Sequence, residues 1–445
     1  MNELTEVRDW CEAVPSPAPF RLTKAVGRLD AAIAREADKR WSVVPGHRAV
    51  LLSRRRWPGW VAPLASAAAL IAVVAGTFAV VSAVRGTRPG PARPAASTYP
   101  DLVCILSQGG IVTRIRDGRA LAPIHVSASS DAIAVTPDGK TAYVAATRGE
   151  RRPGVVIPVQ LATGEVLKPI PVGVWPSAIS LTADGKTAYV TNFLSGTVTP
   201  IATATNTALA PVRVGSRPDQ VVAAPDGRTL YVSREGTITP VRTATGARLR
   251  PLPIPGLGLA QPGHGIVVTP DSKTVYALGF GGTVTPIQRD HALAPVIVPQ
   301  HPDSITLAPG GRTAYVVSIA WPPAPRRRDT ITPINLGNGT TLPPLTVRAS
   351  SNGWGNIAIA PGGKTAYFLD TLLGAVTPIN LATRTAGEPI PSGKGSYTVL
   401  FGQGASIGYL IESHQVVPLN TATNTTLRPI KMPTTVIDWG EAVRR

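Results

Sequence analysis

The side chains best suited to ligand recognition in this sequence are tryptophans, arginines and histidines that stand in loops between short apolar segments. An indole ring offers a large, flat apolar surface on which a sugar ring can stack. A guanidinium group forms two parallel hydrogen bonds with a carboxylate or phosphate. The candidate ligand-binding residues are Trp175, Arg217, Asp219, His264, His301, Trp354, Arg326, Arg327 and Arg328. Together they predict binding of a sugar or an anionic polymer.

Each candidate also has a structural explanation. The arginine run from Arg326 to Arg328 can be a solvated loop, and a histidine just before a strand, such as His264 or His301, commonly satisfies backbone groups. Sequence signatures of enzymes are missing, because there is no Ser-His-Asp order, HExxH motif, paired CxxC, phosphate-binding loop or dinucleotide fingerprint. We therefore predict no catalytic residues, no metal ligands and no cofactor.

A repeated unit must position these loops. The segment TPDGKTAYV at Thr136 to Val144 returns as TADGKTAYV at Thr182 to Val190 and APDGRTLYV at Ala224 to Val232, and further copies follow. Tyrosines mark the copies at positions 143, 189, 231, 276, 315, 367 and 409, about 43 residues apart. A repeat of this length predicts stacked β units or propeller blades.

Each copy predicts four short antiparallel strands, the pattern of a propeller blade. The first two strands join through an Asp-Gly turn, as at Asp138 and Gly139. A proline recurs in the third strand, at Pro158, Pro200, Pro240, Pro286, Pro333, Pro378 and Pro418. Because proline has no amide hydrogen to donate, we expect it to face the outermost strand and to leave the outer half of each blade loosely paired.

The two ends of the repeat region predict eight blades. Before the first full copy, LVCILSQ from Leu102 and the two apolar segments after it supply second, third and fourth strands without a first. The segment TTVIDW, from Thr434 to Trp439, offers a lone first strand. Pairing these segments would close the ring and remove two exposed sheet edges. Seven blades is the alternative, if either segment lies outside the ring.

The copy at Tyr189 to Asn192 reads YVTN, and the other copies are close variants. In this respect the sequence resembles the YVTN-type β-propeller repeats of bacterial and archaeal surface proteins, in their actinobacterial form with recurrent TVTPI segments. The resemblance implies an extracytoplasmic propeller that serves as a binding or structural module. Relatives in the broader group include lactone hydrolases with a metal in the central channel, which supply the alternative function.

The composition supports an all-β body. Charged residues make up 16% of the 445 residues, while glycine and proline number 43 and 45. The low charge excludes a coiled coil and a charge-driven disordered chain, and the many chain breakers leave little room for long helices. The formal net charge of +18 favours anionic partners. We favour phosphate-rich or uronic envelope polymers over nucleic acid, because the basic residues are spread over a domain that should lie outside the cell.

One segment departs from this composition. Residues 61–84 carry no charge and are long enough to cross a bilayer. Arginines at 54, 55 and 56 precede it, so the positive-inside rule predicts a cytoplasmic N-terminus. The predicted organisation is a short helical cytoplasmic segment at 1–60, a transmembrane helix at 61–84, a Pro/Gly-rich spacer at 85–100 and a propeller at 101–445. The helices within residues 1–56 could pack together, bind a protein partner or lie on the membrane.

The predicted function is that of a single-pass cell-membrane protein whose extracytoplasmic propeller binds an envelope glycan, an anionic polymer or a protein without catalysis. The alternative is a metal-dependent lactonase-like hydrolase with its site in the propeller channel. The two hypotheses differ in whether several metal-ligating side chains converge on one point of the channel.

Protease added to intact cells tests the predicted topology. It should cleave the spacer at 85–100 and leave residues 1–56 intact, because the spacer would be exposed outside the cell and residues 1–56 would lie in the cytoplasm. Epitope tags at both ends of the chain, followed by immunoblotting, would report the two fragments. Protection of the propeller instead would reverse the predicted orientation.

Overall fold

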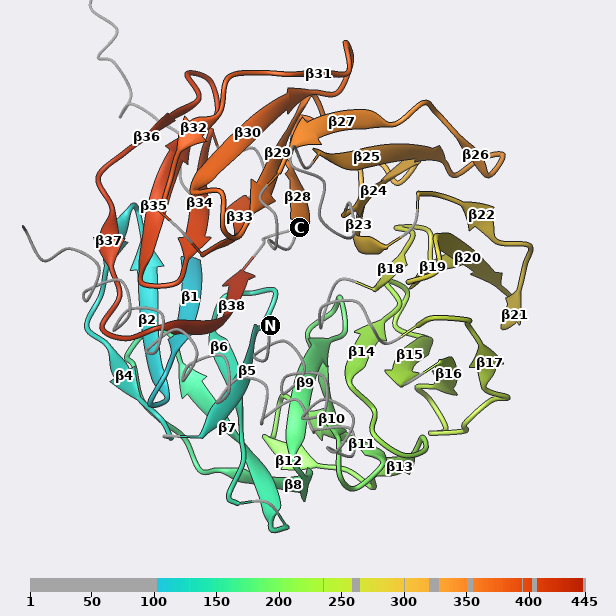
Figure 1. Cartoon of the computed structure of the whole chain (residues 1–445). Helices are drawn as coiled ribbons and strands as arrows, with labels where there is room; N and C mark the ends of the chain where they lie inside the picture. The colour runs from blue at the N-terminus through green and yellow to red at the C-terminus, as the bar shows by residue number, and fades with distance from the viewer. Residues whose placement is uncertain are drawn as a thin grey trace, which may run out of the picture. The chain divides into compact units, whose positions relative to one another are not determined.

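The eight sheets of this protein form blades arranged around a central axis (Figure 1). The computed structural model describes residues 102–127, 129–149, 151–234, 236–257, 265–299, 301–319, 328–349, 355–393, 395–401 and 406–442. The predicted all-β, eight-bladed propeller is confirmed, and the seven-bladed alternative is wrong. The predicted segments 1–60, 61–84 and 85–100 lie outside the described residues. Among the residues that are described, no helix has the length and apolarity needed to cross a membrane.

The second strand of each blade pairs with both the first and the third, and we number the blades from 1 to 8 by their second strands along the chain. The first, innermost strands of blades 1 to 8 are β38 (Val436–Ala442), β5 (Ser130–Val135), β9 (Pro176–Leu181), β14 (Gln220–Ala223), β18 (Ile266–Val268), β23 (Pro302–Leu307), β28 (Gly355–Ile359) and β33 (Ser396–Phe401). The second strands are β1 (Leu102–Ser107), β6 (Thr141–Ala146), β10 (Thr187–Asn192), β15 (Thr229–Arg234), β19 (Thr274–Gly279), β24 (Thr313–Ser318), β29 (Thr365–Asp370) and β34 (Ile407–Glu412).

The outer half of each blade combines one regular strand with short pieces. The third strands are β2 (Ile111–Arg116), β7 (Pro153–Gln160), β11 (Thr197–Ala202), β16 (Thr237–Arg242), β20 (Thr283–Gln288), β25 (Arg328–Asn335), β30 (Ala375–Asn380) and β35 (Gln415–Asn420). The outermost pieces are β3 (Arg119–Ala120), β4 (Ile124–His125), β8 (Ile170–Val174), β12 (Thr207–Ala208), β13 (Val212–Arg213), β17 (Leu252–Pro253), β21 (His291–Ala292), β22 (Val296–Ile297), β26 (Thr340–Thr341), β27 (Leu345–Arg348), β31 (Thr385–Ala386), β32 (Ile390–Pro391), β36 (Thr425–Thr426) and β37 (Ile430–Lys431).

The outermost strand is broken beside the recurrent proline, and blade 1, which has Arg114 at this position, shows the same break between β3 and β4. Pro200 lies in β11 opposite Tyr189 of β10. Its carbonyl oxygen accepts a hydrogen bond from the amide of Leu209 at 2.8 Å, but its nitrogen has no hydrogen to return. The outermost strand therefore pairs with β11 only on either side of the proline, as β12 and β13. The predicted loose pairing of the outer half is confirmed.

The apolar core lies between neighbouring blades. One cluster joins Tyr143 and Val156 of blade 2 to Val190 and Ile201 of blade 3. Successive residues of a strand point to opposite faces of the sheet, so a blade presents apolar side chains to both of its neighbours. A blade consequently buries its surface only when both neighbours are in place.

The repeat tyrosine also bridges adjacent blades through its hydroxyl group. Tyr143 donates a hydrogen bond to Oδ1 of Asn206 in blade 3 at 2.7 Å, and Tyr367 donates to Oδ1 of Asn424 in blade 8 at 2.8 Å. Both acceptors lie in the turn between the third and fourth strands of the following blade. The aromatic ring of this tyrosine is buried and its hydroxyl group is hydrogen-bonded, so the side chain links one blade to the next.

Blade 1 makes this contact with different residues. Cys104 and Arg114 occupy the paired positions that tyrosine and proline hold in the other blades. The buried Arg114 donates from Nη1 to the carbonyl oxygen of Leu161 in blade 2 at 2.8 Å. This carbonyl lies at the turn position where blade 3 receives the Tyr143 hydroxyl. Burial raises the pKa of the Cys104 thiol to about 12, so the thiol stays protonated.

The ring closes through the two ends of the repeat region. Strand β38 pairs with β1 in antiparallel register, from Leu102 opposite Ala442 to Leu106 opposite Asp438. Oδ2 of Asp438 also accepts the backbone amide of Ile133 in blade 2 at 2.8 Å. The predicted closure is confirmed, with the strand displaced two residues from the predicted start at 434.

Truncation after Pro433 should therefore destabilise the whole ring. It removes β38, exposes the edge of β1 and leaves the Ile133 amide without its acceptor. We expect a lower melting temperature and faster aggregation of the truncated chain, measured by thermal unfolding with light scattering. A truncated chain that melts at the temperature of the full chain would contradict this account of closure.

Candidate functional site

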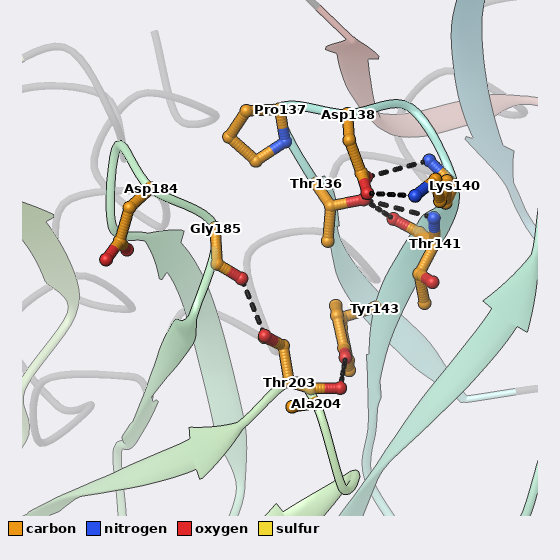
Figure 2. Close-up of a pocket in the computed structure, with 10 residues that line it drawn as sticks. All are labelled: Thr136, Pro137, Asp138, Lys140, Thr141, Tyr143, Asp184, Gly185, Thr203 and Ala204. Atoms are coloured by element: carbon orange, nitrogen blue, oxygen red, sulfur yellow. Dashed lines mark hydrogen bonds and ion pairs between the residues drawn. The ribbon is translucent and has the colours of Figure 1, made fainter.

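One face of the propeller is built from self-contained turns, and we call it the turn face. It consists of the turns that join first to second and third to fourth strands, and Figure 2 shows residues from three of them around a pocket of ≈ 240 Å³. Asp138 accepts the Thr136 hydroxyl at 2.7 Å and the Lys140 backbone amide at 3.1 Å. The equivalent turn at Asp184 is similar, and there the hydrogen bond from the Thr182 hydroxyl lowers the pKa of the carboxyl group. Because these groups satisfy one another, the turn face has a structural role.

The opposite face, which we call the mouth, has strained backbone at three predicted site residues. The mouth is formed by the loops from second to third strands and from one blade into the next. Trp175, Arg217 and His301 each stand directly before a proline at the entry to a first strand, and their φ angles are 58°, 55° and 57°. Gly395 enters blade 8 with a φ of 79°. A left-handed non-glycine residue costs about 1–3 kcal/mol. Such residues also occur on the turn face, as at Asn206 and Arg384.

Two of these residues belong to an aromatic cluster between blades 3 and 4. The rings of Trp175 and Phe193 are 6.1 Å apart between centroids, with their planes tilted by 51°. Cζ of Arg217 lies 5.8 Å from the centroid of Phe193, at the distance of a cation–π contact. The rings are half-buried and Arg217 is exposed. The mouth-facing cluster of Trp175, Phe193 and Arg217 thus combines an apolar stacking surface with a positive charge.

The third strained residue makes a second aromatic contact. His301 meets the ring of Phe280 edge-on, with centroids 4.8 Å apart and an interplanar angle of 64°. Phe280 and Phe193 both follow directly after a second strand, where their rings meet the side chain that precedes the neighbouring first strand. Sequence reasoning missed both phenylalanines. Their shared position after the repeat anchor is the signal that could have found them.

The aspartates near the mouth have structural contacts. Asp219 accepts hydrogen bonds from the Ser233 hydroxyl at 2.5 Å and from the Gln220 amide at 2.8 Å. The buried Asp303 accepts the backbone amide of Gly355 in blade 7 at 2.8 Å. These contacts fix the inner strands from which the mouth loops emerge. A role of Asp219 in ligand binding stays a prediction.

Blade 6 carries an unusual pair of arginines. Arg328 begins β25 and lies directly opposite Arg348 of β27, and both side chains are exposed. Like charges at directly opposed positions destabilise a sheet. Strand β25 has 8 residues, whereas β30 of the next blade has 6, so this hairpin extends further at the mouth. Arg348 was not predicted, because its partner becomes evident only from the register.

Four predicted site residues, His264, Trp354, Arg326 and Arg327, lie outside the described residues. The structure therefore brings together Trp175 and Arg217, places His301 at a separate contact and places Arg328 on the blade 6 hairpin. Within the described ranges, no group of three or more histidine, cysteine, aspartate and glutamate residues is arranged to hold a metal ion.

Asp131 is a carboxyl group at the mouth whose acidity is altered by its surroundings. A bulge in β5 between Ser130 and Ala132 takes Asp131 out of the ladder with β6. Its side chain reaches water, yet the surrounding protein desolvates it and raises its pKa to about 6, against the opposing effect of a hydrogen bond from Thr147. The negative charge at this position consequently appears over the range of mildly acidic pH.

The comparisons with known proteins support the fold alone. No family model matches the chain, and no curated protein sequence matches it. Among solved structures, it is similar to the dihydro-heme d1 dehydrogenase NirN in complex with DHE, with a TM-score of 0.62, 16% identity and coverage of 79% of this chain and 77% of that chain. It is also similar to apo AztD from Citrobacter koseri, with a TM-score of 0.52, 12% identity and coverage of 76% and 96%.

The raised pKa of Asp131 predicts a pH-dependent stability. Its folded pKa of about 6 exceeds the unfolded value of about 3.9. Between these two pH values, unfolding therefore releases a proton from Asp131. The stabilisation contributed by protonated Asp131 is present below pH 4 and is lost as the pH rises to 6. The melting temperature of Asp131→Asn relative to the unmodified chain should rise from pH 4 to 6 and then level off.

Asp138→Asn is the matched control on the turn face. The pKa of Asp138 is lowered, although burial opposes this, because Thr136 and Lys140 hydrogen-bond to its charged form. Its ionised form therefore stabilises the fold above pH 4, and the control variant should lose relative stability as the pH rises. Curves of the same sign for both variants would contradict the assignment for Asp131.

Proposed function

We propose that this chain is a membrane-tethered, extracytoplasmic propeller that binds an envelope glycan or other anionic polymer at its mouth without catalysis. The observation that carries the proposal is the placement of Trp175 and Arg217 in left-handed backbone conformations beside Phe193. A glycine would adopt the same conformation at lower cost. Retaining an indole and a guanidinium group there favours a role in contact with a ligand.

The chemistry of the cluster favours a carbohydrate over a flat hydrophobic ligand. The half-buried Trp175 and Phe193 present apolar surface for the hydrogen-bearing face of a sugar ring, while Arg217 supplies hydrogen-bond donors and positive charge. The opposed pair of Arg328 and Arg348 adds a second cationic position at the mouth. A polymer with acidic groups along its length could use both positions.

The tether and the family assignment come from the sequence. Residues 61–84 would anchor the protein with its N-terminus in the cytoplasm, where residues 1–56 would meet a protein partner, and the YVTN-type repeat would place it among surface propellers. A protein ligand at the mouth is compatible with the same residues. No observation on the described residues favours the lactonase-like alternative, so we do not propose it.

Binding of the full chain to an anionic polysaccharide tests this proposal. Trp175→Ala should weaken binding of polygalacturonate by about tenfold at all salt concentrations, because it removes apolar stacking surface. The double variant Arg328→Ala with Arg348→Ala should weaken binding mainly at low salt and flatten the salt dependence, because screened charge contacts are lost. Isothermal titration calorimetry at several ionic strengths would measure both effects.

Arg228→Ala is the matched control, since Arg228 is an equally exposed arginine of the turn face. It should leave both the affinity and the salt dependence unchanged. If Trp175→Ala and the double arginine variant bind as tightly as the unmodified chain, the mouth is not the binding site.

A further inference from the structure

The last residue of the second strand closes the loop to the third strand in several blades. In blade 3, Nδ2 of Asn192 donates to Oγ1 of Thr197 at 3.0 Å and to Oγ1 of Thr199 at 2.9 Å. In blade 7, Asp370 accepts the amide of Leu372 at 2.9 Å. The polar group at this position therefore serves the fold by forming hydrogen bonds within its own blade.

Blade 4 departs from this pattern at Arg234. Within the part of the chain that the structure describes, no hydrogen bond or ion pair is formed by its guanidinium group, and its Nε is buried without an acceptor. The hydroxyls of Thr237 and Thr239, which occupy the positions of Thr197 and Thr199, are also buried without a described partner. Unsatisfied buried polar groups cost about 1–3 kcal/mol each. Arg234 is therefore unfavourable for the fold of its own blade.

The neighbouring loop makes room for this side chain. Gly215 has a φ of 113°, and a Cβ atom on it would lie 2.6 Å from Nη1 and 2.9 Å from Cζ of Arg234. The guanidinium group of Arg234 thus packs on the loop that leads, two residues later, to Arg217. Asp219, the nearest acidic residue of this loop, is held by Ser233. The guanidinium group of Arg234 thus lies beside this short loop, and that of Arg217 extends from it over Phe193. Among the described residues, no carboxylate forms an ion pair with either group.

We propose that Arg234 and Arg217 together hold the oxyanion of an acidic sugar whose ring stacks on Trp175. Two guanidinium groups beside one loop can donate several hydrogen bonds to a carboxylate or phosphate oxygen pair, and the partly buried setting strengthens these bonds. This assignment rests on the proposed function and narrows its ligand from an envelope polymer to a sugar that carries a carboxylate or a phosphate.

The decisive variant is Arg234→Asn, which restores in blade 4 the amide found at Asn192. The new amide should satisfy Thr237 and Thr239 and raise the melting temperature by roughly 1–3 °C. The same variant should weaken binding of tetragalacturonate at least tenfold, because the oxyanion loses one of its two guanidinium partners. A gain in stability with a loss of binding is an outcome that damage to the fold would not produce.

Three ligands measured by calorimetry with the full chain in neutral-lipid nanodiscs separate the sources of the oxyanion. Tetragalacturonate supplies carboxylates, its methyl ester removes their charge, and glucose 6-phosphate supplies a phosphate. The unmodified chain should bind the methyl ester at least tenfold more weakly than the acid. Arg234→Asn and Arg217→Met should each reduce that preference, and Arg228→Met should leave it unchanged. A preference for glucose 6-phosphate, lost in the same variants, would support phosphate as the oxyanion.

The two proposals fail in different ways. If neither tetragalacturonate, its ester, glucose 6-phosphate nor purified envelope polymer binds the unmodified chain, the proposed function is wrong. If Trp175→Ala abolishes binding while esterification, Arg234→Asn and Arg217→Met have no effect, the mouth still binds a glycan and the oxyanion site is wrong. A destabilised Arg234→Asn would likewise contradict the account of Thr237 and Thr239.

Discussion

The break in the outermost strand of each blade determines where the propeller is held together. At residues such as Pro200 the third strand accepts a hydrogen bond from the outermost strand but has no amide hydrogen to donate, and the two strands pair regularly only on either side. The blades are instead held to one another by the tyrosine hydrogen bonds and by contacts between neighbouring first strands. In one such contact, Asp303 accepts the amide of Gly355. The mouth loops leave from these inner strands, and their strained residues depend on that rigidity.

The architecture could be predicted from the sequence because one pattern recurs in seven imperfect copies. A single copy would have been ambiguous. Blade number and ring closure followed from the unmatched segments at the ends, and β38 beside β1 agrees. The site was only partly readable. Trp175 and Arg217 stood out by residue type, but Phe193, Arg348 and Arg234 gained meaning from ring distances, strand register and the space over Gly215, none of which a linear sequence contains.

Because the blades repeat one unit, residues at equivalent positions of different blades can be compared directly. Blade 1 replaces the tyrosine and proline with Cys104 and Arg114, yet Arg114 reaches the same carbonyl position in the next blade. The contact between blades is therefore maintained although the residues differ. Arg234 shows the opposite case, in which a residue changes and the contact made by Asn192 is given up. Comparing equivalent positions in this way distinguishes substitutions that keep the contact, as at Arg114, from substitutions that lose it, as at Arg234.

The pairing of Leu102 with Ala442 has a consequence for how the mouth is presented. Strand β1 runs from the turn face toward the mouth, and β38 runs the other way, so the described propeller both begins and ends at the turn face. Both ends of the described propeller therefore lie on the face opposite to Trp175 and Arg217, so the mouth consists of loops alone.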